Sequence, residues 1–261
     1  MTNDKPYYTL NAKPYNLTIG WLYPELMNIY GDRGNVIVLQ KRCGWRRIKT
    51  RVLELNVGFE NQDLRKCDLI LMGGAQDKQQ ETVSKDLFGK KDLLKKIIED
   101  NIPGLYICGA YQFLGNYYKE ANGHKIKGLG IFDLYSENSG ENVQRLIGNA
   151  TFKSDLLDYT LIGFENHGGR TYLGKGILPF GKVIKGFGNN GKDGLEGAVY
   201  KNSFGTYLHG PILPKNPRFA DYLIKNALEQ KYKTRIELET LDDNLEEKAR
   251  LAIAKRLSVA I

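Results

Sequence analysis

Residues 105–112 read Leu-Tyr-Ile-Cys-Gly-Ala-Tyr-Gln, a short apolar run that ends in a cysteine and two small residues. A proline-glycine pair directly before this run breaks the chain, so the run predicts a short buried strand. Residues 110–119 have a helical pattern. Cys108 is therefore expected at the turn from a strand to a helix, and the small Gly109 and Ala110 suit such a crowded turn.

The same organisation occurs upstream of this stretch. Residues 67–72 form another short apolar run, Cys-Asp-Leu-Ile-Leu-Met, which ends in two glycines. Uninterrupted apolar runs of this length suit parallel strands that are covered on both faces. Between the two runs, residues 85–101 carry leucine and isoleucine at helical spacing, which predicts one amphipathic helix.

Further elements extend the pattern towards the N-terminus. Residues 17–23 indicate a first buried strand, and residues 31–40 indicate a helix entered through a turn. Residues 48–55 alternate apolar and polar side chains, as in a strand with one face in water. Alternating strands and helices are the signature of an α/β fold with an open, mostly parallel sheet and helices on both faces.

The rest of the chain is less regular. Residues 123–210 are rich in glycine, and short β-like runs occur at 129–132, 183–186 and 197–200. Asn216-Pro217 is a plausible helix start, with asparagine as N-cap and proline at the first helical position. The charged tail contains spaced leucines, which predict a helix packed on the domain or on a partner. We expect an irregular leader (1–16), one domain (17–232) and a helical tail (233–261).

Composition excludes several protein classes. The 261 residues carry a net charge of +8, but the basic residues are dispersed, so we prefer a solvated basic surface to a nucleic-acid site. Attraction to an anionic partner or substrate is the second choice. No stretch approaches the ~18 consecutive apolar residues of a membrane span, and the N-terminus lacks a secretory signal. We therefore expect a cytoplasmic protein without membrane insertion.

The three cysteines differ in their sequence context. Cys43, Cys67 and Cys108 show no CxxC spacing, so the sequence predicts neither a disulfide framework nor a metal site. Only Cys108 lies between a predicted strand and a helix, where a nucleophile elbow would expose it at the sheet edge. The positive end of the following helix favours a thiolate there. The alternative is a buried structural cysteine, which is our interpretation of the other two.

His209 is the candidate base for this thiol. It follows a short β-like run and precedes a Gly-Pro turn. Such a histidine can take a thiol proton and return it to a leaving group. His167 is interpreted as structural and His124 as a surface residue. Two backbone amides, those of Gly74 and Gly109, are expected to form an oxyanion hole, although the first glycine also suits an ordinary turn.

Three motifs together resemble the class I glutamine amidotransferases, and specifically their cobyric acid synthase-like branch. Cys108-Gly-Ala-Tyr-Gln112 resembles its Cys-Gly-Gly-Tyr-Gln motif, with alanine in place of the second glycine. Gly163-Phe-Glu-Asn-His-Gly-Gly-Arg170 resembles its Gly-Tyr-Glu-x-His block, and Tyr207-Leu-His-Gly-Pro211 its histidine motif. The resemblance implies a flavodoxin-like fold and a glutaminase that releases ammonia from L-glutamine through a Cys108 thioester.

Four further segments resemble the glutaminase subunits of bacterial lipid II isoglutaminyl synthases: 26–35, 73–77, 145–148 and 164–167. Those enzymes amidate the α-carboxyl of D-glutamate in peptidoglycan synthesis. The resemblance spans roughly residues 17–230. It implies a heterodimer with a Mur-ligase-like synthetase subunit, which would bind lipid II, ATP and magnesium, while this chain would hold no cofactor or metal.

The resemblance also implies that Arg145 holds the α-carboxylate of glutamine. A guanidinium pairs with a carboxylate through two parallel hydrogen bonds. The alternative is a solvated surface arginine. Gln112 is expected to line the same pocket.

Two features depart from expectation. The broad class I pattern has a glutamate two residues after the histidine, but this chain has Pro211 there. Cys108 and His209 would then act as a dyad, or another residue orients the imidazole; our hypothesis is a carboxylate from the partner subunit. Residues 186–193 nearly match a phosphate-binding loop, but Asp193 replaces the hydroxyl residue, so we predict a surface hairpin rather than an ATP site.

Three alternatives stay open from the sequence. The first is a glutaminase that serves another acceptor, such as cobyrinate, and the second is a related thiol peptidase or γ-glutamyl hydrolase. The non-enzyme alternative is a basic interaction protein that binds nucleic acid, which would show salt-sensitive binding independent of Cys108.

Overall fold

The computed structural model describes residues 15–75, 77–140 and 142–261. Within them, a central sheet is built from β1 (Asn16–Leu22), β2 (Lys49–Leu55), β3 (Leu69–Met72), β4 (Gly104–Ile107), β13 (Ala198–Tyr200) and β14 (Ser203–Thr206). The strand order is β13-β14-β4-β3-β1-β2. All neighbours pair in parallel except β13 with β14. The expected mostly parallel sheet is confirmed.

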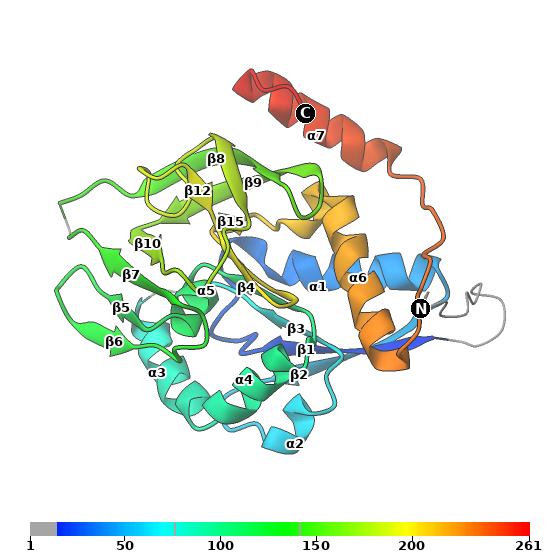
Figure 1. The fold of residues 1–261 in the computed structure, drawn as a ribbon, viewed down its shortest axis with the longest axis horizontal. Helices are drawn as coiled ribbons and strands as arrows, with labels where there is room; N and C mark the ends of the chain where they lie inside the picture. Colours follow the sequence, from blue (N-terminus) through cyan, green and yellow to red (C-terminus); the bar gives the residue numbers. More distant parts are fainter. Residues whose placement is uncertain (1–14, 76, 141) are drawn as a thin grey trace.

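Helices cover both faces of this sheet (Figure 1). One face carries α1 (Arg33–Trp45) and α6 (Pro217–Tyr232), and the other carries α2 (Asn61–Leu64), α3 (Asp77–Phe88) and α4 (Lys91–Glu99). Because both faces are covered, every residue of β3 and β4 is buried. This explains why both strands appear in the sequence as continuous apolar runs.

Three predictions of local structure were wrong. The single helix expected at 85–101 is two helices, α3 and α4, which are separated at Gly89 because glycine is a poor helix former. The helix expected at 110–119 is the short α5 (Gly109–Leu114), which ends at an extended Gly115; β5 (Tyr117–Lys119) follows. The run at 129–132 forms no strand, because its backbone N–H groups donate to carbonyls at the end of α5 and at Gly115.

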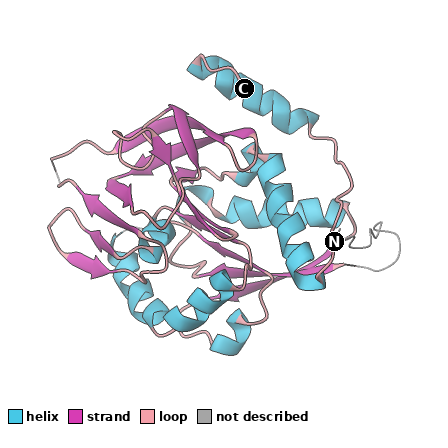
Figure 2. Ribbon diagram, viewed as in Figure 1, coloured by secondary structure: helices cyan, strands magenta, loops and turns pink. Residues whose placement is uncertain are grey.

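The glycine-rich middle of the chain forms two additional sheets. One contains β5, β6 (Lys125–Lys127), β7 (Leu134–Asn138) and β10 (Gly169–Leu173); the other contains β8 (Leu146–Ser154), β9 (Tyr159–His167), β11 (Gly181–Lys185), β12 (Leu195–Glu196) and β15 (Leu208–His209). Figure 2 shows these strands gathered beyond one end of the central sheet. The strands expected near 183–186 and 197–200 are confirmed as β11 and β13.

The chain passes directly from the central sheet into the second added sheet. Only Tyr207 separates β14 from β15, and His209 in β15 pairs with Phe164 of β9. His209 therefore lies where the two parts of the molecule join. Short 3-10 helices, η1 (Ile29–Gly31) and η2 (Leu213–Lys215), precede α1 and α6.

The expected helix in the tail is present as α7 (Asn244–Leu257) and packs on the rest of the chain. Its buried Arg250 donates to Asn216 Oδ1 and to the Thr160 carbonyl. Asn216 does occupy the N-cap position of α6, but its side chain bonds to Ile162 and Ile212 instead of capping the helix. Residues 1–14 of the predicted leader lie outside the described residues. Among the described helices, none has the length and apolar character to cross a bilayer.

Candidate active site

Cys108 stands on a sharp turn between β4 and α5. Its φ of 52° and ψ of −105° place it in a region that L-residues rarely adopt. Such strain costs about 1–3 kcal/mol and persists only where the surroundings hold it. Here the Cys108 N–H donates to the Thr206 carbonyl, and the Cys108 carbonyl accepts from Gln112 N–H. The elbow geometry expected from the sequence is therefore present.

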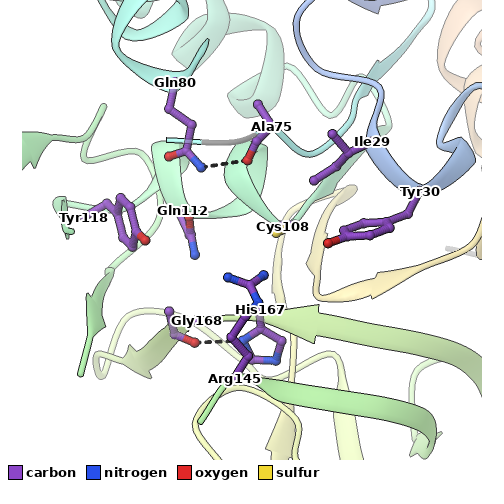
Figure 3. Close-up of a pocket in the computed structure, with 11 residues that line it drawn as sticks. Ile29, Tyr30, Ala75, Gln80, Cys108, Gln112, Tyr118, Arg145, His167 and Gly168 are labelled. Carbon is purple, nitrogen blue, oxygen red and sulfur yellow. Dashed lines mark hydrogen bonds between the residues drawn. The ribbon is translucent and has the colours of Figure 1, made fainter. Parts of the chain in front are cut away.

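The turn opens onto a cavity of about 310 Å³ (Figure 3). The cavity is lined by Ile29, Tyr30, Ala75, Gln80, Cys108, Gln112, Tyr118, Arg145, His167, Gly168 and Gly169. The central sheet and its loops contribute Cys108 and Ala75, whereas the added sheets contribute Arg145 and His167 on the opposite side. The cavity thus brings together Cys108, Gln112 and Arg145, each of which the sequence predicted as a site residue.

His209 lies beside Cys108, and Gly74 lies against both residues. A β-carbon at Gly74 would lie 2.8 Å from His209 Cε1 and 3.2 Å from Cys108 Cβ. Any side chain at position 74 would therefore displace the candidate base from the candidate nucleophile. The His209 ring is fully buried and meets the ring of Tyr30 edge-on, with 4.9 Å between the ring centroids.

A carboxylate of this chain contacts the imidazole. Asp32 Oδ1 lies 3.4 Å from His209 Nδ1, and Asp32 Oδ2 accepts the Gly74 N–H at 2.8 Å. The sequence left open which residue orients the imidazole, and Asp32 is one that lies against it; a carboxylate from the partner subunit stays a prediction. The expected oxyanion role of Gly74 is wrong, because its N–H is already bonded to Asp32.

Another backbone N–H is better placed for the oxyanion. A β-carbon at Gly109 would lie 3.4 Å from the Ala75 nitrogen, so these two amides are close neighbours. Within the described part of the chain, the Ala75 N–H has no hydrogen-bond acceptor. The Gly109 N–H is the first of α5 and has no acceptor within its helix. Ala75 and Gly109 therefore form a pair of available donors beside Cys108.

The charge state of His209 follows from its neighbours. Burial by itself lowers the pKa of His209, but the negative charge of Cys108 and the hydrogen bond to Asp32 outweigh burial and raise the pKa to about 10. The protonated imidazole is thus favoured while the thiolate faces it. His209 Nε2 has no hydrogen-bond partner among the described residues, which leaves it available for proton transfer.

The substrate side of the cavity is polar. Arg145 donates from Nε to Asn166 Oδ1 and from Nη2 to the Asn166 carbonyl, both at 2.9 Å. Gln112 donates from Nε2 to the Tyr207 hydroxyl at 3.0 Å, and its Oε1 is buried without a partner in the described chain. A guanidinium and a free amide oxygen are suitable groups for an α-carboxylate and an α-ammonium, respectively.

The other two histidines have different environments. His167 lines the cavity, donates from Nδ1 to the Gly169 carbonyl at 2.7 Å, and stacks on Tyr207 with 3.6 Å between the rings. Burial lowers the pKa of His167, so it stays neutral and supports the cavity wall. This agrees with the structural interpretation of His167. His124 is exposed and contacts Glu120.

The remaining candidate features have ordinary roles. Burial raises the pKa of Cys43 and of Cys67 to about 12, which makes both thiols unreactive. The near-match to a phosphate-binding loop lies in the hairpin from β11 to β12, as expected. Its Asn190 Oδ1 accepts the N–H groups of Lys192 and Asp193, so these amides do not form a phosphate cradle. No group of potential metal ligands occurs among the described residues.

Sequence reasoning missed four residues of this site: Asp32, Tyr30, Ala75 and Asn166. Asp32 and Tyr30 lie inside the quoted segment 26–35, and Asn166 lies inside 163–170. Asp32 is the single acidic residue of segment 26–35, and this was a usable signal for it. Nothing in the sequence indicated which of the amides after β3 would be free.

The sequence of the chain is similar to those of known proteins. The family model of the CobB/CobQ-like glutamine amidotransferase domain matches residues 18–217. The chain is 46% identical over 217 residues to the lipid II isoglutaminyl synthase (glutamine-hydrolyzing) subunit GatD of Staphylococcus aureus, covering 83% of this chain and 86% of that protein. It is 39% identical over 246 residues to the subunit of the same name from Streptococcus pneumoniae, covering 92% of each.

More distant similarities agree with these. A probable cobyric acid synthase of Methanothermobacter thermautotrophicus is 33% identical over 198 residues, which cover 71% of this chain but 38% of that protein. A crystal structure of a glutamine amidotransferase superposes with a TM-score of 0.57 at 17% identity, covering 80% of this chain and 98% of the other. At that identity the superposition supports the fold alone.

Proposed function

The chain belongs to the CobB/CobQ-like glutamine amidotransferase family, and from this premise we propose that it is the glutamine-hydrolysing subunit of a lipid II isoglutaminyl synthase. One observation carries the catalytic part of the proposal: Cys108, on its strained turn, shares a cavity with Arg145, and His209 lies beside it. The acceptor is supported by the two subunits named GatD, which match this chain over most of their length.

The proposed reaction begins with the Cys108 thiolate. It attacks the side-chain amide carbon of L-glutamine, forming a C–S bond and a tetrahedral oxyanion. The protonated His209 gives its proton to the amide nitrogen, which leaves as ammonia when the C–N bond breaks. Water then attacks the γ-glutamyl thioester while His209 takes its proton, and glutamate leaves as the thiolate is restored.

The oxyanion is held by the backbone N–H groups of Ala75 and Gly109. Both are close to Cys108, and both lack an acceptor in the described chain. Donors of this kind stabilise the transition state because they already point to where negative charge develops. Asp32 bonds to His209 Nδ1, which leaves Nε2 as the nitrogen that exchanges protons with substrate.

Glutamine is oriented from two sides of the cavity, by Arg145 on the wall opposite Cys108 and by Gln112 on α5. Arg145 pairs with the α-carboxylate, and the free Oε1 of Gln112 accepts from the α-ammonium. These contacts place the γ-amide towards Cys108. The charged ends of the amino acid are thus bound away from the reacting carbon.

Ammonia is proposed to pass to a Mur-ligase-like synthetase subunit in a heterodimer. That subunit would bind lipid II and use ATP and magnesium to activate the D-glutamate α-carboxyl, whereas this chain would hold no cofactor. The need for ATP favours the cytoplasm as the location. Cobyrinate is a weaker candidate acceptor, because the chain matches only 38% of the cobyric acid synthase described above.

The function is tested by purifying the tagged chain from its own cells, recovering its partner, and assaying the complex with glutamine, ATP and lipid II. We expect glutamate release and amidation of lipid II, both lost in Cys108→Ala. Glutamate release without lipid II amidation would refute the acceptor. Glutamate release that persists in the Cys108→Ala complex would refute the catalytic assignment.

A further inference from the structure

Asn166 joins two residues that approach the cavity from different parts of the molecule. Its Oδ1 accepts from Arg145 Nε at 2.9 Å, and its Nδ2 donates to the Tyr30 hydroxyl at 2.8 Å. Arg145 precedes β8 in an added sheet, whereas Tyr30 lies in η1 beside the central sheet. One amide side chain therefore links the two walls of the cavity.

The contacts with Asn166 determine which edge of the Arg145 guanidinium is free. Nε and Nη2 both donate to Asn166, so this edge is occupied. Nη1 lies on the other side, 3.3 Å from where a β-carbon of Gly168 would be. Figure 3 shows the guanidinium pointing into the cavity. The remaining edge, formed by Nη1 and Nη2, is suited to a carboxylate that binds through two oxygens.

Tyr30 is held in an unfavourable backbone conformation at the same place. Its φ of 53° breaks the helical geometry of η1, and the residue is 44% exposed although it lines the cavity. The ring stands edge-on against His209. A strained aromatic residue needs an anchor, and the hydrogen bond from Asn166 is such an anchor.

We propose that Asn166 is a positioning residue whose hydrogen bonds link Arg145 and Tyr30 across the cavity. These hydrogen bonds orient one edge of the Arg145 guanidinium towards a free α-carboxylate and hold the Tyr30 ring against His209. This arrangement therefore selects free glutamine over substrates whose α-carboxyl is blocked. The inference rests on the proposed function, because it takes glutamine as the substrate.

The test compares Asn166→Ala and Tyr30→Phe with wild type, each assayed as the co-purified complex. Asn166→Ala removes both links, and we expect KM for glutamine to rise about tenfold because a charged hydrogen bond loses its partner. Tyr30→Phe removes one neutral hydrogen bond and is expected to raise KM about threefold. In both variants kcat should stay within about threefold of wild type, since the reacting groups are unchanged.

The second readout is the preference for glutamine over glutamine α-amide, which lacks the carboxylate. This preference should fall in Asn166→Ala. Asn149→Ala on neighbouring β8 and Tyr135→Phe are matched controls with exposed side chains and should behave as wild type. Wild-type KM and preference in a folded Asn166→Ala complex would overturn the inference, as would a loss confined to kcat. Absence of glutamine hydrolysis in the wild-type complex would instead refute the proposed function itself.

Discussion

The two walls of the cavity differ in how firmly their functional groups are buried. On the wall around Cys108, which is 7% exposed, Asp32 and His209 are almost completely buried. On the wall that holds Arg145, that residue is exposed and Asn166 is half-buried. Proton transfer and thiolate attack benefit from fixed, desolvated groups, whereas a charge that captures a carboxylate from water must be accessible. The comparison assigns the chemistry to the wall around Cys108 and the capture of the substrate carboxylate to the wall that holds Arg145.

The largest effect is expected for Cys108→Ser, which tests whether the chemistry takes place on the wall around Cys108. The hydroxyl is far less acidic than the thiol, so we expect kcat for glutamine hydrolysis to fall at least about 10³-fold. Initial-rate measurements of glutamate release would show it. Cys67→Ala, which changes a buried thiol away from the cavity, is the matched control and should keep its activity. Substantial glutaminase activity in Cys108→Ser would mean that the nucleophile lies elsewhere.

The next largest effect is expected for Asp32→Asn. Asparagine has one acceptor oxygen and no charge, so it cannot serve both the Gly74 N–H and the protonated His209 Nδ1 as the Asp32 carboxylate does. We therefore expect kcat to fall about 10²-fold while KM stays near wild type. Steady-state kinetics of the complex would separate the two constants. Asp155→Asn, in an exposed turn, is the control for the same chemical change. An unchanged kcat would show that Asp32 does not orient the base and would favour the hypothesis of a carboxylate from the partner.

On the recognition wall, Arg145→Ala should produce the opposite pattern. Losing the charged hydrogen bonds to the α-carboxylate is expected to raise KM about 10- to 100-fold, with a much smaller change in kcat. The same kinetic assay applies, with Arg51→Ala on the edge strand β2 as control. If kcat collapsed while KM held, Arg145 would belong to the chemistry and the contrast between the walls would fail.

The smallest expected effect concerns the two buried histidines. His209 should titrate near pH 10 and His167 below its usual 6.5, because His209 faces negative charge whereas burial dominates at His167. The raised pKa of His209 stabilises the folded state fully below pH 6.5, and this contribution is lost as pH rises through about 10. NMR titration of labelled imidazoles measures the pKa values of both histidines. Cys108→Ala should lower the pKa of His209 and leave that of His167 in place; equal shifts would contradict the account.

The sequence identified the chemistry wall better than the recognition wall. β3 and β4 were predictable because both faces are covered, which requires continuous apolar residues. The Cys108 turn followed from the strand before it and the small residues after it. Both signals are local, so one segment of sequence contains all of the information.

Other parts of the site depend on contacts between distant segments. Asp32 meets His209 across 177 positions of sequence, and Tyr30 meets Asn166 across 136. No periodicity encodes such pairings. The choice between Gly74 and Ala75 depends on which N–H the Asp32 carboxylate occupies, which only the fold determines. The added sheets were harder to predict because β6 is only three residues long, and because neither β8 nor β11 alternates buried and exposed residues along its whole length.

The central claim, that Cys108 attacks glutamine in this cavity, is tested most directly by labelling the wild-type complex with a glutamine-analogue electrophile and mapping the adduct by mass spectrometry. The account predicts one adduct, on Cys108, which excess glutamine prevents. An adduct on Cys43 or Cys67, or no adduct in a complex that still hydrolyses glutamine, would contradict it.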